Sequence, residues 1–187
     1  MSKNLKDFIF HQNIFCKDLA KDIILEYGDA NFDRTSHHNK ETRHLGSVDI
    51  SATETINQVN SYERAAILEK IKIEIQKIVD EYLLFINVKS LPIDQASHFS
   101  LRQMNEEDWY GEHDDDGVGN ATGDYKFTLS ICLNEDYKGG DFGFFNNKKK
   151  YKLKTGDVLM FPSNFMFPHC VNKITKGTRY QLLLWLR

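Results

Sequence analysis

The sequence predicts a mainly β fold with flanking helices, in which a double-sheet, jelly-roll core is buttressed by N-terminal helices. Apolar residues recur with helical spacing in the first half of the chain, whereas short strand-like runs separated by turn residues fill the second half. A chain of 187 residues is also long enough for one well-buried core. We therefore expect 1–187 to form a single domain, with helical support and a lid loop in 1–93 and the β core in 94–187.

Two stretches in the first half have helical periodicity. Apolar residues recur every 3.6 residues or so over 13–27 and again over 62–86, and a shorter helical segment covers 55–60. The longer apolar stripe is expected to pack across a sheet. Pro92 ends the helical region, because the residue before a proline is pushed towards an extended conformation.

The segment 28–50 is polar and has no period, which predicts a long loop. A loop of this length is a candidate lid over a substrate. It contains His37, His38 and His44, which are candidate metal ligands, although exposed histidines are the more common finding in such loops.

The second half of the chain changes character after Ile93. Strand-like runs lie at 97–104, 125–133, 142–145, 151–154, 157–161 and 179–186. Turn residues such as Gly139-Gly140 and Asn146-Asn147 separate them. The basic run 148–150 is interpreted as the solvated tip of a hairpin. Many short strands at close spacing are typical of a double-sheet β architecture.

Composition excludes several classes of protein. The formal charge of −3 gives no electrostatic reason to expect a nucleic-acid partner. No apolar run approaches the roughly 20 residues of a membrane-spanning helix, and the first residues have no signal-peptide core. The three cysteines, Cys16, Cys132 and Cys170, form no paired framework, which suits a reducing compartment. We therefore expect a cytoplasmic protein without a membrane partner.

The stretch 109–116 contains a candidate metal motif. If it is a strand, the side chains of His113 and Asp115 point to the same face. Together with the distant His169 they would make a two-histidine, one-carboxylate triad, which holds non-haem Fe(II) and leaves coordination positions open. The alternative is that the acidic run is a solvated edge and His169 a core histidine. Spacing alone favours the metal site only slightly.

Arg179 adds a second observation. It opens the almost wholly apolar run 180–186, which predicts a buried strand. A buried arginine needs an anionic partner, and its planar guanidinium can bind a carboxylate through two hydrogen bonds. A salt bridge to a protein carboxylate is the structural alternative.

Six sequence blocks follow one another in an order that resembles a known family. They are Tyr110-x-x-His113-x-Asp115, 127–134 (FTLSICLN), 139–142 (GGDF), 156–161 (GDVLMF), 169–171 (HCV) and 177–180 (GTRY) followed by Trp185. This pattern resembles the Fe(II)- and 2-oxoglutarate-dependent dioxygenases of the prolyl 4-hydroxylase type. The resemblance covers about residues 97–187 and implies a double-stranded β-helix core.

The resemblance also implies roles for individual residues. His113, Asp115 and His169 would bind Fe(II), and Arg179 would pair with the distal carboxylate of 2-oxoglutarate. The co-substrate pocket would further be lined by Tyr110, Thr128, Val171 and Trp185. No side chain beyond the metal ligands would be needed for catalysis. Fe(II), 2-oxoglutarate and O2 are the implied cofactors and co-substrates, with ascorbate as a candidate reductant.

Two positions depart from the family pattern. Cys132 stands where relatives usually have a tyrosine, so a hydrogen bond to the co-substrate is absent or supplied elsewhere. Gln181 stands where relatives usually have a small residue, so the co-substrate end of the pocket is expected to have a different shape.

The resemblance implies hydroxylation of a prolyl residue in a peptide or protein, with another amino acid or a small molecule as alternative substrates. A nucleic-acid demethylase is less consistent, because that branch has a second arginine six residues after the first, where this chain has Trp185. A non-enzymatic metal-binding β-sandwich, or a zinc site with an open position, is the alternative from another class.

Overall fold

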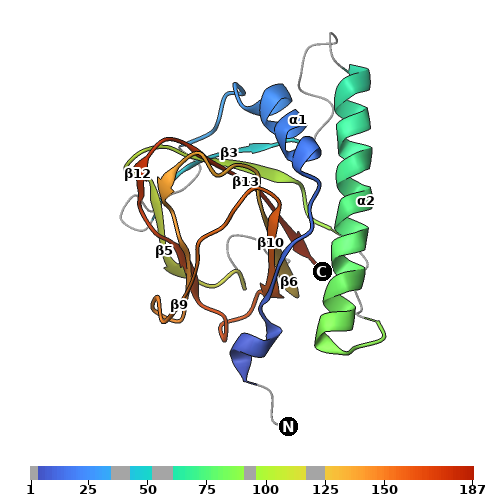
Figure 1. Ribbon diagram of the computed structural model, residues 1–187, viewed down its shortest axis with the longest axis vertical. Helices are drawn as coiled ribbons and strands as arrows, with labels where there is room; N and C mark the ends of the chain where they lie inside the picture. The colour runs from blue at the N-terminus through green and yellow to red at the C-terminus, as the bar shows by residue number, and fades with distance from the viewer. Residues whose placement is uncertain (1–3, 35–42, 52–60, 91–95, 117–124) are drawn as a thin grey trace.

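The computed structural model describes residues 4–34, 43–51, 61–90, 96–116 and 125–187. Two antiparallel β-sheets lie against each other, and two helices cover the outer face of the larger sheet (Figure 1). The predicted fold class is confirmed: the structure is mainly β, with a jelly-roll core and N-terminal helices.

The two helices bury one face each against the larger sheet. Helix α1 (Lys17–Tyr27) packs through Leu19 and Ile23, and the long helix α2 (Ser61–Ile86) packs through Ile71 and Ile78. These side chains are buried with the outward-facing leucines of the sheet, which is the amphipathic arrangement that the periodicity predicts. Among the described helices, none is both long enough and apolar enough to cross a membrane.

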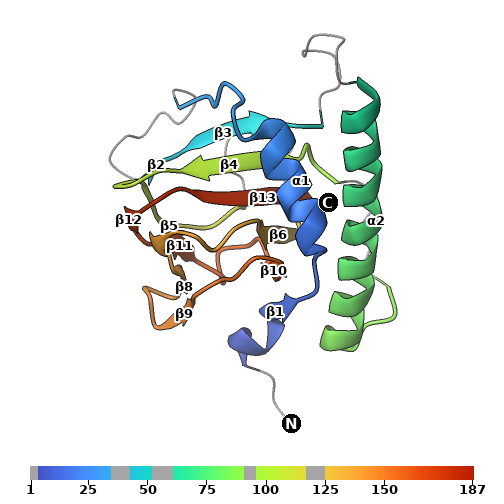
Figure 2. The same ribbon diagram turned by 45° about the horizontal axis from the view of Figure 1, so that its top comes forward.

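The larger sheet has six strands in the order β1-β10-β6-β13-β4-β3 (Figure 2). Their bounds are β1 Phe10–Asn13, β10 Asp157–Pro162, β6 Phe127–Cys132, β13 Arg179–Leu186, β4 Ser100–Met104 and β3 Gly46–Asp49. Side chains alternate along β13, so Leu182 and Leu184 face the helices while Arg179 and Gln181 face the smaller sheet. One face of β13 therefore packs against the helices, and its other face lines the space between the two sheets.

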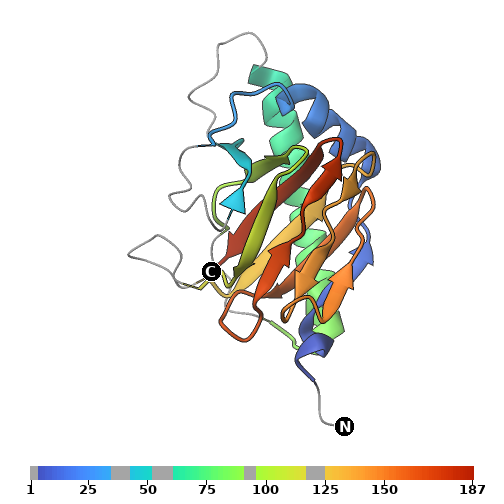
Figure 3. The ribbon, with the colours of Figure 1, turned by 90° about the vertical axis from the view of Figure 1, so that its left-hand side faces the viewer.

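The smaller sheet has five strands in the order β2-β5-β11-β8-β9, and Figure 3 shows the sheets with the helices behind them. Its strands are β2 Arg43–His44, β5 Trp109–His113, β11 His169–Val171, β8 Phe142–Phe144 and β9 Lys149–Tyr151. A third, two-stranded sheet pairs β7 (Lys138–Gly139) with β12 (Ile174–Lys176), and a short 3-10 helix, η1, spans Leu5–Phe8.

A second core fills the space between the two sheets. It joins Met104, Leu159 and Phe161 of the larger sheet to Phe142 and Phe144 of the smaller one. All five are almost fully buried. The candidate metal ligands lie at the edge of this aromatic core.

Several boundaries differ from the prediction. The predicted helix over 13–27 begins only at Lys17, and a strand, β1, precedes it. The predicted loop 28–50 was wrong over its second part, which contains β2 and β3. The strand predicted over 151–154 lies earlier in the chain, since β9 is Lys149–Tyr151. The segment 55–60, Pro92, His37 and His38 lie outside the described residues.

Candidate active site

The structure brings His113, Asp115 and His169 together. Nε2 of His113 lies 3.5 Å from Oδ1 of Asp115, and Nε2 of His169 lies 3.4 Å from Oδ2. One ligand atom from each residue lies within 4.8 Å of the other two. Two atoms bound at right angles to one ion at about 2.1 Å are about 3 Å apart, so these side chains fit around a single metal ion. No other such group occurs in the described part of the chain.

A bulge in β5 shapes one side of this cluster. His113 pairs with His169 and Tyr110 pairs with Val171, so β5 has two residues between its paired positions where β11 has one. A bulge of this kind breaks the regular alternation of faces. It places Tyr110 and His113, three residues apart, on the same face of the sheet.

Asp115 lies beyond the end of β5. Its backbone N–H donates to the carbonyl oxygen of Ser163 at 3.0 Å, in the connection between β10 and β11. The predicted reason for its position, strand alternation with His113, was therefore wrong, although the two side chains do lie together. A hydrogen bond to a neighbouring connection, rather than strand geometry, holds the carboxylate beside the histidines.

Both histidines are oriented by the same kind of contact. Nδ1 of His113 lies 2.9 Å from the carbonyl oxygen of Gly111, and Nδ1 of His169 lies 3.0 Å from that of Phe167. A carbonyl oxygen can only accept, so Nδ1 carries the proton in each ring. Each Nε2 is left with its lone pair directed towards the cluster. Contacts of this kind fix the tautomer and the ring orientation of metal-binding histidines.

One hydroxyl group, which a second hydroxyl group contacts in turn, holds the Asp115 carboxylate. Thr128 Oγ1 donates to Oδ2 of Asp115 at 2.6 Å, and Ser163 Oγ lies 2.9 Å from the Thr128 hydroxyl. All three side chains are buried. In the structure, Thr128 therefore contacts the candidate metal ligand Asp115. Its contact with a co-substrate stays a prediction.

Aromatic rings surround His169. The ring of Phe142 stacks on it at 5.4 Å, and that of Phe161 meets it edge-on at 4.9 Å. Burial lowers the pKa of His169 to about 4, against the opposing effect of Asp115. Burial also acts to raise the pKa of Asp115, but His169, His113 and the Thr128 hydroxyl outweigh it and hold this pKa below its usual range. At neutral pH the imidazole is thus neutral and the carboxylate ionised, as metal binding requires.

Two of the predicted pocket residues, Tyr110 and Val171, lie on the smaller sheet, and a third, Trp185, lies on the larger sheet. The ring of Tyr110 stacks on His113 at 3.7 Å, and Val171 is its buried partner on β11. The guanidinium of Arg102 lies 5.5 Å from the Tyr110 ring and 5.6 Å from the Trp185 ring. Tyr110 and Val171 therefore border the metal cluster directly, and Trp185 joins them through Arg102. Whether they contact a co-substrate stays a prediction.

Arg179 is completely buried between the sheets. Nη1 donates to Oε1 of Gln181 and to Sδ of Met104, the latter at 3.6 Å. Its Nε and Nη2 groups have no hydrogen-bond partner among the described residues. The expected alternative, a salt bridge from Arg179 to a protein carboxylate, does not occur within the described residues. Burying a cation without an anion is costly, so this end of the interior suits an anionic group.

The space beside Cys132 contains a phenol. The Cys132 thiol donates to the carbonyl oxygen of Asn134 at 3.1 Å, and the Tyr137 hydroxyl lies 3.6 Å from its Sγ. Burial raises the pKa of Tyr137 well above its usual value, although the nearby Arg179 opposes the shift. Tyr137 therefore brings a protonated hydroxyl beside Cys132.

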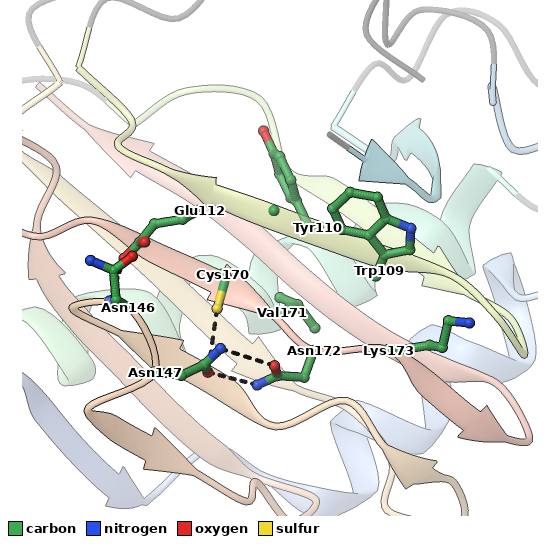
Figure 4. Close-up of a pocket in the computed structure, with 10 residues that line it drawn as sticks. Trp109, Tyr110, Glu112, Asn146, Asn147, Cys170, Val171, Asn172 and Lys173 are labelled. Carbon is green, nitrogen blue, oxygen red and sulfur yellow. Dashed lines mark hydrogen bonds between the residues drawn. The ribbon is translucent and has the colours of Figure 1, made fainter. Parts of the chain in front are cut away.

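A separate hollow of about 440 Å³ lies on the other face of the smaller sheet (Figure 4). Trp109, Glu112, Asn147 and Asn172 line it, and the Cys170 thiol at its base points towards Asn147. Cys170 lies between His169 and Val171 on β11, so its side chain faces away from the metal cluster. Tyr110 and Val171 also line the hollow, so it adjoins the two strands that carry the candidate metal site.

Sequence reasoning missed the residues that support the site. Ser163, Arg102 and Tyr137 belong to none of the six blocks, and Ser130 lies in the block 127–134 but was given no role. The sequence could have indicated Arg102 as an interior residue, because it lies within the predicted strand 97–104 on the same face as the buried Ser100 and Met104. The others become visible only when strands distant in sequence pair.

Comparisons with known proteins agree with this geometry. The profile of the 2OG-Fe(II) oxygenase superfamily matches residues 99–187. The chain is 30% identical over 96 residues to a PKHD-type hydroxylase of Idiomarina loihiensis, which covers 50% of this chain and 43% of that relative. It thus spans less than half the length of the curated relatives it matches.

Two solved structures have the same fold. A viral collagen prolyl hydroxylase from Paramecium Bursaria Chlorella virus-1 superposes with a TM-score of 0.68 at 13% identity, covering 96% of both chains. A prolyl hydroxylase from Trichoplax adhaerens gives a TM-score of 0.68 at 18% identity, covering 96% of this chain and 83% of the other. The matched range includes all three candidate metal ligands and Arg179, so residues 99–187 are similar to the 2OG-Fe(II) oxygenase superfamily in the part that carries the site.

Proposed function

We propose that this protein is an Fe(II)- and 2-oxoglutarate-dependent dioxygenase that hydroxylates a prolyl residue in a peptide or protein. The observation that carries the proposal is the pairing of one metal-competent cluster, His113, Asp115 and His169, with a buried arginine whose Nε and Nη2 groups lack a partner in the described residues. The similarity to the 2OG-Fe(II) oxygenase superfamily supports Fe(II), 2-oxoglutarate and O2 as cofactor and co-substrates. Ascorbate as a reductant and a cytoplasmic location stay predictions.

Each part of the site would have a separate task. His113, Asp115 and His169 would hold Fe(II), which when bound supplies the chemistry that activates dioxygen. Arg179 would bind the distal carboxylate of 2-oxoglutarate and so fix the orientation of its other end. Thr128 and Ser163 would keep the Asp115 carboxylate in place, and the aromatic residues around His169 would exclude water. No protein nucleophile is required.

The peptide substrate is inferred from the proteins that this chain resembles. The Trichoplax adhaerens structure is a complex with a hypoxia inducible factor oxygen degradation domain peptide fragment, and the viral structure is named a collagen prolyl hydroxylase. We extend this substrate class to the present chain, with another amino acid or a small molecule as the alternative. We also propose that 1–187 act as one domain, with 1–93 supporting the site in 94–187.

The test is turnover of 2-oxoglutarate by the purified, Fe(II)-loaded protein under air with a library of prolyl peptides. We expect succinate and a peptide heavier by one oxygen atom. His113→Ala and His169→Ala should abolish iron binding, whereas Arg179→Ala should retain iron and weaken 2-oxoglutarate binding about 100-fold, because a two-point charged contact is lost. Folded, iron-loaded protein that forms no succinate with any peptide would contradict the proposal.

A further inference from the structure

Only one nitrogen of the Arg179 guanidinium, Nη1, has a hydrogen-bond partner within the described residues, and the Tyr137 hydroxyl lies near the group. Nη1 is taken by Oε1 of Gln181 and by the sulfur of Met104. The two nitrogens without a partner in the described residues, Nε and Nη2, lie on the opposite edge of the same planar group. This edge presents two parallel N–H groups, the arrangement that matches the two oxygens of a carboxylate.

Gln181 is itself fixed by a second contact. It is 3% exposed, and its Nε2 donates to Ser130 Oγ on the adjacent strand β6 at 2.7 Å. Because the NH2 group is occupied by Ser130, the amide oxygen is the atom that faces Arg179. The amide therefore connects β6 to the guanidinium and determines which edge of Arg179 remains available.

Gln181 also occupies space at this end of the interior. Its side chain points inward beside Cys132, its partner across β6, and it lies between Arg179 and Ser130. The backbone of Gly140 lies close to the side chain of Arg179, since a Cβ at Gly140 would lie 3.3 Å from Cδ of Arg179. Interior side chains are close-packed, so the length of Gln181 limits how far a ligand can extend past the arginine.

We propose that Gln181 is a positioning and specificity-determining residue, which orients Arg179 for a carboxylate and sets the length of the 2-oxo dicarboxylate that the site accepts. The inference rests on the proposed function. The Gln181 side chain would have two effects on the bound ligand. It hydrogen-bonds to Arg179, and it occupies space beside it, and separate variants can distinguish the two.

Three substitutions separate these effects. Gln181→Met keeps the approximate length but removes both hydrogen bonds, so 2-oxoglutarate should bind about 10-fold more weakly with the same preference over 2-oxoadipate, which is one methylene longer. Gln181→Ala removes the bulk, so the ratio of the two affinities should shift about 10-fold towards 2-oxoadipate. Gln181→Glu keeps the shape but places a carboxylate on Arg179, so both ligands should bind most weakly of all.

Binding is measured directly, without turnover. Anaerobic protein loaded with Mn(II) is titrated with 2-oxoglutarate and with 2-oxoadipate by calorimetry. Gln103→Met is the matched control, because Gln103 lies on the opposite face of β4 and contacts Tyr180 and Arg34. Melting temperature and Mn(II) affinity report whether each variant is folded.

The outcomes keep the two proposals apart. Wild-type protein that binds Mn(II) but neither dicarboxylate would overturn the proposed function. Wild-type protein that binds 2-oxoglutarate, with Gln181→Met, Gln181→Ala and Gln181→Glu all binding it equally well, would overturn the role of Gln181 alone. An unchanged preference in Gln181→Ala would remove the length-setting effect and leave only the orienting one.

Discussion

Thr128 is the residue through which the site is most directly tied to the larger sheet. Its hydroxyl donates to Asp115 at 2.6 Å, so Thr128→Val, which keeps the shape and removes the donor, should weaken divalent metal binding about 10-fold. Thr128→Ser keeps the hydroxyl and serves as the control. Calorimetric titration with Mn(II) checks this. Equal affinities in the valine and serine variants would show that the hydrogen bond does not support the metal site.

The candidate ligands could be predicted from sequence because they fall in a short motif, whereas their supports could not. His113 and Asp115 are two residues apart, and His169 opens a recognisable block. Thr128 and Ser163 meet Asp115 only because β6 and β10 pair and the connection after β10 turns back. No local pattern encodes that meeting, which depends on contacts between segments distant in sequence.

The turn between β7 and β8 packs against the side chain of Arg179. Gly140 has φ +67°, and a Cβ there would lie 2.5 Å from Cδ1 of Ile174 and 3.3 Å from Cδ of Arg179. Gly140→Ala should therefore lower the free energy of unfolding by about 1–3 kcal/mol and weaken 2-oxoglutarate binding about 10-fold. Urea unfolding and calorimetric titration measure the two effects.

Gly156→Ala is the control for this turn. Gly156 also has a positive φ, +86°, and its Cβ would lie 2.8 Å from the backbone oxygen of Phe15, next to α1. It should lose similar stability while the folded fraction keeps its affinity for 2-oxoglutarate. If both alanine variants lost affinity alike, the loss would reflect general destabilisation and not the contact with Arg179.

Among the elements, periodicity predicted those with strong patterns and missed those without. The long helix, expected over 62–86, is Ser61–Ile86, and the strand expected over 179–186 is Arg179–Leu186. Strands β1 and β3 were missed because their sequences, FHQN and GSVD, are short and largely polar. They pair at the two edges of the six-stranded sheet, where partner strands rather than intrinsic propensity decide the conformation.

For the whole molecule, the buried His169 predicts a loss of stability in mild acid. Its pKa is about 4 in the folded metal-free protein and about 6.5 when unfolded, so the unfolded state takes up the proton first. The free energy of unfolding should thus fall by about 2 kcal/mol between pH 7.5 and pH 5, and by about 3 kcal/mol in full below pH 4. Urea unfolding in the presence of a chelator measures this.

His169→Leu is the matched variant for the acid effect, because leucine does not titrate. The part of the pH dependence that His169 causes should disappear in it, whatever its absolute stability. A slope between pH 7.5 and pH 5 that was the same in both proteins would mean that other groups dominate.

The central position of β13 also has a consequence for how the protein is made. This strand is the last along the described chain, yet it lies between β6 and β4, where it pairs with both. While the ribosome is still synthesising residues 179–186, neither the six-stranded sheet nor the arginine end of the site can form. Long-range pairing of this kind folds slowly. A nascent chain therefore exposes one unpaired edge of β4 and one of β6 until β13 emerges, and the candidate site is complete only after that.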